Sequence, residues 1–255
     1  MSALLAASGV HKSFDGFRVL DNVSFAVPER GLAGIVGTNG AGKSTLFAVV
    51  SGQLAADSGR VSFADADIVG MPPLRRARLG LGRTFQVPRD FAHLTVRENF
   101  LVAARREYGE TLRSVFIGWG RVRREETMLV ERADGWIDFL NLRAVAGKPA
   151  GTLSGGQKKL LELGRMLMTK PRCILLDEPF AGVNPVLVED ISNRIRELNA
   201  THGIAFVIIE HHLEALKALV QHLYVMDQGR VIADGEPAAV LAEPRVLEAY
   251  MGGVI

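Results

Sequence analysis

The sequence contains a single cysteine, Cys173, in 255 residues, so no internal disulfide can form. Its flanks, Arg172 and the apolar residues 174–176, predict a buried strand, which suits a reducing compartment. Nowhere does an uncharged apolar run approach the roughly 18 residues that a membrane-spanning helix needs. Residues 1–10 have no basic stretch and no long apolar core, so no signal peptide is expected. The sequence predicts a soluble protein, for which any membrane role comes through a partner.

A strong charge imbalance is also missing. The chain has 30 Lys and Arg against 28 Asp and Glu, which gives a formal net charge of +2 and a pI near 8.8. This excess is too small to predict nucleic acid or anionic lipid as the main partner. Internal repeats and low-complexity tracts are not visible. What is present is a hydrophobic content of 48%, enough for one large α/β domain or a core with a smaller lobe.

Three short apolar runs are each followed at once by residues suited to ligand binding. Residues 31–36 precede a glycine-rich turn, residues 173–176 precede Asp177 and Glu178, and residues 205–209 precede Glu210 and His211. With helical stretches between them, these runs are typical of a mostly parallel sheet covered on both faces. Ligands of such sheets bind at the carboxyl edge of the strands.

Antiparallel structure is predicted near both ends of the chain. Residues 4–10 and 23–27 flank a turn at Asp15-Gly16 and predict an N-terminal β lobe, and residues 223–226 and 231–233 flank a hairpin turn at 227–230. The charged residues between about 97 and 150 predict a helical subdomain with an inserted loop, and the tail 244–252 predicts a short amphipathic helix. The expected organisation is one domain over 1–255, with a core of residues 1–96 and 165–255 and a helical subdomain of residues 97–164.

A glycine-rich segment lies between the first strand and a predicted helix that begins at Lys43. It fits the phosphate-binding pattern G-x-x-x-x-G-K-S/T. Its residues are Gly37, Thr38, Asn39, Gly40, Ala41, Gly42, Lys43 and Ser44. Successive N–H groups of such a loop point at phosphate oxygens, and the helix adds its positive end. Lys43 would reach the β- and γ-phosphates and Ser44 would hold Mg²⁺; the alternative is a plain glycine turn.

Two adjacent acids follow the apolar run 173–176. The strand would deliver Asp177 beside the metal ion and Glu178 beside the attacking water, which makes Glu178 the candidate general base. A pair of charges at a helix N-terminus is the alternative. The phosphate-binding loop favours the catalytic interpretation, because the two features support one another.

A second serine-glycine motif lies at residues 153–157 and precedes a helical run, 158–167. Its N–H groups could bind a second phosphate by the same helix-end effect. Taken alone, an N-cap serine followed by a glycine turn explains it better.

The ordered set of motifs resembles the ATP-binding cassette (ABC) family over essentially the whole chain. The set comprises residues 37–44, Gln86, residues 153–157, residues 175–178 and His211. The resemblance implies an α/β fold: a P-loop ATPase core with a mostly parallel sheet, an N-terminal antiparallel β lobe and a helical subdomain that carries the serine-glycine motif. It also implies that two cassettes, identical or related, close head-to-tail around two ATP molecules with Mg²⁺.

The resemblance assigns roles to individual residues. Ser154 and Gly156 would contact the γ-phosphate bound to the partner's loop. Gln86 would approach Mg²⁺ and water and couple the site to a transmembrane subunit. His211 would contact the γ-phosphate, although a lone histidine after a strand is ordinarily a surface or capping residue. The adenine-stacking aromatic falls on Phe14, with Phe17 close by. The implied catalytic residues are Glu178, His211 and Gln86, the implied metal ligands are Ser44, Gln86 and Asp177, and the implied nucleotide contacts are Phe14, residues 37–44, Thr45, Ser154, Gly155, Gly156 and Gln157.

Shorter strings resemble the importers of branched-chain amino acids and related amides. They are residues 82–86, 94–99 and 181–185, an Arg/Glu-rich insertion near 105–132, and the ending 246–252. This resemblance implies an ATPase subunit at the cytoplasmic face of the membrane, bound to permease subunits and served indirectly by a solute-binding protein, with no nucleic-acid partner. Two positions depart from these patterns: Asn184 stands where most cassettes of the wider family have aspartate, and His212 stands where the importer group usually has aspartate. Asn184 keeps the hydrogen-bonding shape and loses the charge.

Two other functions remain open at this level. One is an exporter motor such as the lipopolysaccharide-transport cassette, which shares a segment of the type 180–183. The other is a soluble cassette protein of translation or repair, but such proteins usually carry two cassettes or long coiled-coil arms, and this sequence shows neither. The solute cannot be read, because an importer's motor does not touch it. The basic insertion is interpreted as a solvated helical face in preference to a contact with the membrane subunit.

Overall fold

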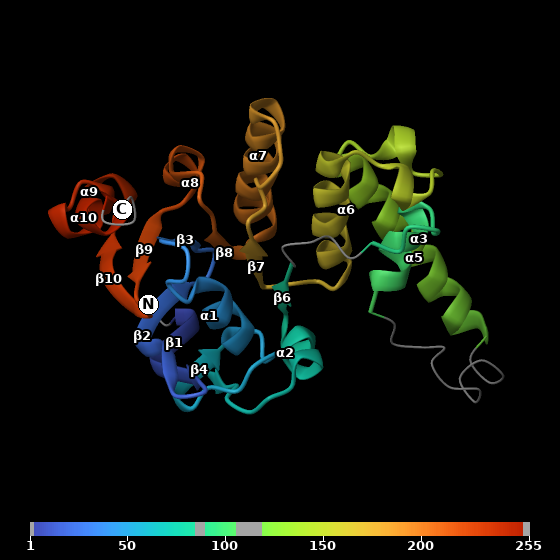
Figure 1. Cartoon of the computed structure of the whole chain (residues 1–255). Helices are drawn as coiled ribbons and strands as arrows, with labels where there is room; N and C mark the ends of the chain where they lie inside the picture. The colour runs from blue at the N-terminus through green and yellow to red at the C-terminus, as the bar shows by residue number, and fades with distance from the viewer. Residues whose placement is uncertain (1–2, 85–89, 106–118, 252–255) are drawn as a thin grey trace. The chain divides into compact units, whose positions relative to one another are not determined.

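The computed structural model describes residues 3–84, 90–105 and 119–251. The chain forms two compact units, one of residues 1–86 and 171–255 and the other of residues 87–170. The helical subdomain expected at residues 97–164 falls within the second unit. Strands dominate the first unit and helices the second (Figure 1).

An antiparallel sheet forms the N-terminal lobe of the first unit. Its order is β2-β1-β4-β5, with every neighbouring pair antiparallel. The predicted turn at Asp15-Gly16 joins β1 to β2, and both of its residues have positive φ, 48° and 83°, as a two-residue hairpin of type I′ requires. The strands are β1 (Ala3–Phe14), β2 (Phe17–Pro28), β4 (Ser58–Phe63) and β5 (Ala66–Asp67).

A six-stranded sheet forms the core of the first unit, in the order β10-β9-β3-β8-β7-β6. Five strands are parallel, and only β10 runs antiparallel to its neighbour β9. Every residue of β3, β7 and β8 is buried, as expected for parallel strands covered on both faces. The strands are β3 (Leu32–Gly37), β6 (Leu81–Arg83), β7 (Cys173–Asp177), β8 (Ala205–Ile209), β9 (His222–Asp227) and β10 (Arg230–Gly235).

The helices of the first unit follow strands of one or the other sheet. The helix expected at Lys43 and the one expected in the C-terminal tail are both present, and α9 and α10 follow β10 at the sheet edge (Figure 1). The helices are α1 (Lys43–Val50), α2 (Pro73–Leu79), α7 (Pro185–His202), α8 (Leu213–Leu219), α9 (Pro237–Leu241) and α10 (Pro244–Met251). The α/β fold class with a mostly parallel sheet and an antiparallel lobe is confirmed.

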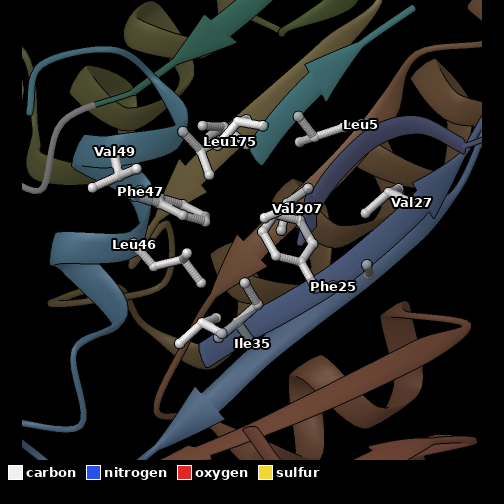
Figure 2. Packing of buried hydrophobic residues seen from close by; sticks show 14 of the residues in the cluster. Leu5, Phe25, Val27, Ile35, Leu46, Phe47, Val49, Leu175 and Val207 are labelled. Atoms are coloured by element: carbon white, nitrogen blue, oxygen red, sulfur yellow. The ribbon is translucent and has the colours of Figure 1, made fainter. Parts of the chain in front are cut away.

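The main core of this unit lies where the two sheets and α1 meet. Leu5 and Phe25 of the lobe, Phe47 of α1, and Leu175 and Val207 of the parallel strands point into one cluster (Figure 2). Full burial of a side chain of this size stabilises the fold by about 1.5–3 kcal/mol. The core therefore fixes α1, and with it the end of the phosphate-binding loop, against both sheets.

The second unit is helical. Its helices are α3 (Val96–Ala103), α5 (Trp119–Phe139) and α6 (Gly155–Met168), with short 3₁₀ turns η1 (Arg143–Val145) and η2 (Ala150–Thr152). Gly164 of α6 allows close packing, since a Cβ there would lie 2.1 Å from the ring of Phe100. Within the described part of the chain, no helix is both long and apolar enough to cross a membrane.

Candidate nucleotide-binding and catalytic site

Three parallel strands end side by side at the carboxyl edge of the six-stranded sheet. β3 ends at Gly37, β7 ends at Asp177, and Ile209 at the end of β8 pairs with both β3 and β7. The phosphate-binding loop follows β3, Glu178 follows β7, and Glu210 and His211 follow β8. Segments that are far apart in the sequence thus meet where parallel sheets bind their ligands.

Two glycines of the loop are required by its close packing. Gly37 has φ 152° and Gly42 has φ 96°, and both values are open mainly to glycine. A Cβ on Gly37 would lie 2.0 Å from the carbonyl oxygen of Met226, and one on Gly42 would lie 2.7 Å from the carbonyl oxygen of Val19. The loop is therefore pressed between β9 and β2, and any side chain at these two positions would displace it.

Lys43 is buried inside this loop, with 6% of its surface exposed. Its Nζ donates hydrogen bonds to the carbonyl oxygens of Gly37 and Thr38, at 2.8 and 2.9 Å. Burial lowers the pKa of Lys43, and the negative charges of Glu178 and Asp177 act in the opposite direction. Ser44 follows with an exposed side chain, and the first turn of α1 holds no acidic residue. The positive end of α1 and a buried ammonium group thus meet in one loop, which suits phosphate.

Asp177 and Glu178 differ in backbone geometry although they are adjacent. Asp177 ends the strand, and the residue is 4% exposed. Glu178 has φ 51°, a left-handed conformation that costs a non-glycine residue energy. Its backbone N–H donates to the carbonyl oxygen of Ile209 at 2.9 Å, so the turn is held by the neighbouring strand. Strain of this kind clusters at functional sites.

The carboxylate of Glu178 lies beside the ring of His211. Glu178 Oε1 and His211 Nε2 are 3.1 Å apart. The Glu178 side chain is 18% exposed and the His211 side chain 46%, so the pair is open to solvent on the histidine side. The structure therefore brings together the two residues that the sequence assigned to the base and to the γ-phosphate contact.

Glu210 is a site residue to which the sequence analysis gave no role. It is 3% exposed, and Oε1 accepts a hydrogen bond from the backbone N–H of Phe180 at 2.6 Å. Oε2 accepts from the N–H groups of His211 and His212, at 3.0 and 3.3 Å. Glu210 thus joins the loop after Glu178 to the loop of His211. The available signal was a charged residue directly at the end of a buried strand.

Arg83 and Thr84 also reach this site without having been assigned a role. Arg83 Nη2 donates to Asp177 Oδ2 at 3.0 Å. Thr84 Oγ1 accepts from the N–H of Asp177 at 3.3 Å. In the sequence, both residues appear only within the string 82–86, which carries the resemblance to the importers and gives neither residue a role. Gln86 itself lies outside the described residues.

The serine-glycine motif starts α6 in the second unit. Ser154 is the N-cap: its Oγ accepts from the N–H of Gln157 at 3.3 Å, and Gln157 Oε1 accepts from the N–H of Ser154 at 3.0 Å. The local arrangement is the capping serine considered from the sequence. Ser154 and Gly155 are exposed, whereas Gly156 is buried, so an anion can approach the start of α6 over Ser154 and Gly155.

Phe14 lies at the end of β1, beside the hairpin turn. It is 42% exposed, and Phe17, its partner across the hairpin, is 73% exposed. Lys12 Nζ lies 5.3 Å from the centroid of the Phe14 ring. Both aromatic rings are therefore available for stacking, and the geometry favours neither as the adenine contact.

The two departures from aspartate are both N-caps. The Oδ1 of Asn184 accepts from the N–H of Leu187 at 2.9 Å, at the start of α7. The Nδ1 of His212 accepts from the N–H of Ala215 at 3.3 Å, at the start of α8. Asparagine is as good an N-cap as aspartate, so Asn184 retains the local function that aspartate would serve. An imidazole acceptor replaces the carboxylate at position 212.

The chemistry of the site suits Mg²⁺ that arrives with phosphate. Ser44 offers a hydroxyl and Asp177 a carboxylate. Mg²⁺ is commonly held by one or two protein oxygens and completes its shell with phosphate and water. Across the described ranges, no cluster of three His, Cys, Asp or Glu could hold a metal by itself. The residues present therefore fit a metal ion carried in by a nucleotide.

Comparisons with known proteins match this site and fold. A family model described as "ABC transporter" matches residues 20–181, and one described as "Branched-chain amino acid ATP-binding cassette transporter" matches residues 230–254. A crystal structure of the ADP conformation of an ATP-binding cassette of an ABC transporter has a TM-score of 0.86, at 43% identity, and covers 99% of this chain and 100% of that one. The chain belongs to the ABC transporter family.

The narrower resemblance is confirmed by individual relatives. The probable branched-chain amino acid transport ATP-binding protein LivG of Methanocaldococcus jannaschii is 43% identical over 254 residues, covering 98% of this chain and 97% of that protein. The high-affinity branched-chain amino acid transport ATP-binding protein BraF of Pseudomonas aeruginosa is 35% identical and covers 98% of each chain. The chain is thus similar along its whole length to ATP-binding proteins of this one group.

Proposed function

We propose that this chain binds ATP with Mg²⁺ in the loop 37–44 and hydrolyses it, with Glu178 as the general base. The observation that carries the proposal is the position of the Glu178 carboxylate, 3.1 Å from His211 Nε2, at the sheet edge where the phosphate-binding loop also begins. A base next to a phosphate-binding loop can take the proton of a water that attacks the γ-phosphate.

The other residues position the nucleotide and stabilise charge. Lys43 and the N–H groups at the start of α1 bind the phosphates, and His211 contacts the γ-phosphate. Ser44, Asp177 and Gln86 would hold Mg²⁺, and the bound ion would neutralise charge on the β- and γ-phosphates. Phe14 or Phe17 stacks on the adenine. Positioning and electrostatic stabilisation supply most of the catalysis in phosphoryl transfer.

A second cassette completes each site in this proposal. The start of α6 is exposed at Ser154 and Gly155, and in this proposal Ser154 and Gly156 contact a γ-phosphate bound to a partner cassette. The helical subdomain, which the sequence placed at 97–164, would present this motif. Hydrolysis by an isolated chain is then slow, because one chain supplies only part of each closed site.

We further propose that the ATPase powers import of branched-chain amino acids or related small polar solutes such as urea or amides. The names of the relatives and the match over residues 230–254 support this solute class. The partners would be permease subunits, a second cassette and, indirectly, a solute-binding protein. The chain would then work at the cytoplasmic face of the membrane.

Substitution of the proposed base separates binding from turnover. Glu178→Gln keeps the size of the side chain and removes its basicity, so we expect ATP affinity to stay within about twofold and turnover to fall at least about 100-fold. Calorimetry and phosphate release measure the two quantities. Glu189→Gln, at an exposed position in α7, is the matched control and should behave as wild type. Wild-type turnover by Glu178→Gln would exclude Glu178 as the base.

A further inference from the structure

Arg83 is nearly buried at the centre of the site, with 11% of its side chain exposed. One end of its guanidinium contacts Asp177, with Nη2 3.0 Å from Oδ2. The other amino group, Nη1, donates to Gln53 Oε1 at 2.9 Å and to Ser51 Oγ at 3.2 Å. Arg83 therefore spans from the carboxylate at the end of β7 to the residues that follow α1.

The surroundings of Arg83 favour a positive charge without fully satisfying its donors. Ser51 caps the C-terminal end of α1, where the helix dipole is negative. The guanidinium carbon also lies 5.8 Å from the centroid of the Phe47 ring, a cation–π distance. Its Nε is buried and has no hydrogen-bond partner. A position selected for hydrogen bonding alone would not leave a buried donor unpaired, so the charge opposite Asp177 is the feature that needs explanation.

Charge balance limits what can bind at Asp177. Lys43 and Arg83 lie beside the carboxylates of Asp177 and Glu178, while the buried carboxylate of Glu210 accepts hydrogen bonds from backbone N–H groups. A bare divalent ion at Asp177 therefore meets a carboxylate that is already paired with a guanidinium. A nucleotide changes the balance, because its phosphates bring their own negative charge to the metal ion.

We propose that Arg83 is the counter-ion of Asp177 in the nucleotide-free protein. Its guanidinium prevents the Asp177 carboxylate from binding a divalent cation that arrives alone, and releases the carboxylate when the cation arrives together with nucleotide phosphates. The inference rests on the proposed function in one respect, namely that Asp177 is the metal-binding acid. Arg83 acts through Asp177 and is a positioning residue. It would make metal binding conditional on nucleotide.

Binding of Mn²⁺ to the nucleotide-free protein tests this directly, because Mn²⁺ substitutes for Mg²⁺ and its free form is counted by electron paramagnetic resonance. Arg83→Met keeps much of the side-chain length and removes the charge, and should bind Mn²⁺ roughly tenfold more tightly than wild type, since a unit charge a few ångströms from the ion is lost. Arg83→Lys keeps the charge and should stay close to wild type. The double variant Arg83→Met/Asp177→Asn should lose the gain.

Two further measurements separate the outcomes. Circular dichroism and the melting temperature establish that each variant is folded. Wild-type Mn²⁺ affinity is measured with and without ATP: the proposal requires weak binding alone and tight binding with ATP, and equal affinities overturn it without any variant. A folded Arg83→Met protein with wild-type Mn²⁺ affinity would also overturn the proposal and would leave Arg83 with a structural role only. If the wild-type chain binds no ATP, the proposed function fails instead.

Discussion

At the end of β7 the backbone changes from a buried strand to a left-handed turn within one residue. Asp177 completes the strand, and Glu178 takes φ 51° at a cost of about 1–3 kcal/mol. The hydrogen bond from Glu178 to Ile209 and those accepted by Glu210 hold the turn in place. The position of the proposed base thus depends on Glu210, a residue that would not touch the nucleotide.

Removal of the Lys43 side chain should weaken ATP binding directly. Its buried ammonium group already faces carbonyl oxygens in the loop, and a charged hydrogen bond is worth about 1.5–3 kcal/mol. Lys43→Ala should therefore weaken ATP binding at least about tenfold. Calorimetry with ATP measures the loss, and Lys217→Ala, exposed in α8, serves as the control. An unchanged affinity would remove Lys43 from the phosphate site.

The sequence identified residues whose chemistry appears in a contiguous motif, and missed those that act across the fold. Residues 37–44 and the pair Asp177-Glu178 could be recognised because spacing along the chain determines their positions. Arg83 and Asp177 are 94 positions apart, and Glu210 reaches Phe180 over 30 positions. Such contacts depend on which strands become neighbours, and local pattern does not fix that order.

At the scale of elements, Ser154 at the start of α6 has two roles: it caps the helix, and it is proposed to contact the γ-phosphate. Ser154→Ala removes the cap, at a cost of about 1 kcal/mol, and it should also lower ATP turnover at least about tenfold in the assembled transporter. Thr95→Ala is the matched control, since Thr95 forms the same kind of capping box at the start of α3. We expect Ser154→Ala and Thr95→Ala to lose comparable stability, and only Ser154→Ala to lose ATP turnover.

Equal turnover in the two variants would contradict a phosphate-binding role for α6. Denaturant unfolding gives the two stability losses and phosphate release gives the two rates. The comparison works because both residues lie in the same helical unit and cap their helices in the same way.

The C-terminal helix α10 brings Tyr250 against the phosphate-binding loop. Burial raises the pKa of Tyr250 to about 12, and the backbone of Gly37 acts in the opposite direction. The unfolded chain ionises this tyrosine near pH 10, whereas the folded chain keeps it neutral to about pH 12. The folded state therefore loses relative stability as the pH rises from about 10 to about 12.

Tyr250→Phe should remove this loss. Denaturant unfolding at pH 8.5 and at pH 11.5 should show a larger drop in the free energy of unfolding for wild type than for Tyr250→Phe. The other titrating groups are common to both proteins, Tyr224 among them, so the difference isolates Tyr250. Identical drops would mean that α10 does not shield this tyrosine.

Most elements of the first unit could be predicted because each carries a local signal. Turns with left-handed residues marked both hairpins, and apolar runs marked β3, β7 and β8. The short strand β6 (Leu81–Arg83) has too few residues for a pattern, and pairing with β7 makes it a strand. The order of the six strands likewise follows from packing between distant segments, so no local signal reports it.

At the scale of the whole molecule, the two proposed phosphate-binding features lie in different units. The loop 37–44 belongs to the first unit and Ser154 to the second. In the proposed transporter each nucleotide contacts the loop 37–44 of one cassette and the Ser154 region of the other cassette. The chain would then be a component whose activity depends on assembly with a second cassette and permease subunits.

The central claim is that this chain is the motor of a membrane importer. Its most direct test is affinity purification of the tagged Glu178→Gln chain from gently solubilised cells with MgATP, followed by identification of the proteins that accompany it. The Gln variant should hold the closed assembly, so we expect polytopic membrane proteins and a second cassette in stoichiometric amounts. Recovery of ribosomal or DNA-bound proteins, with no membrane subunit, would contradict the transport role.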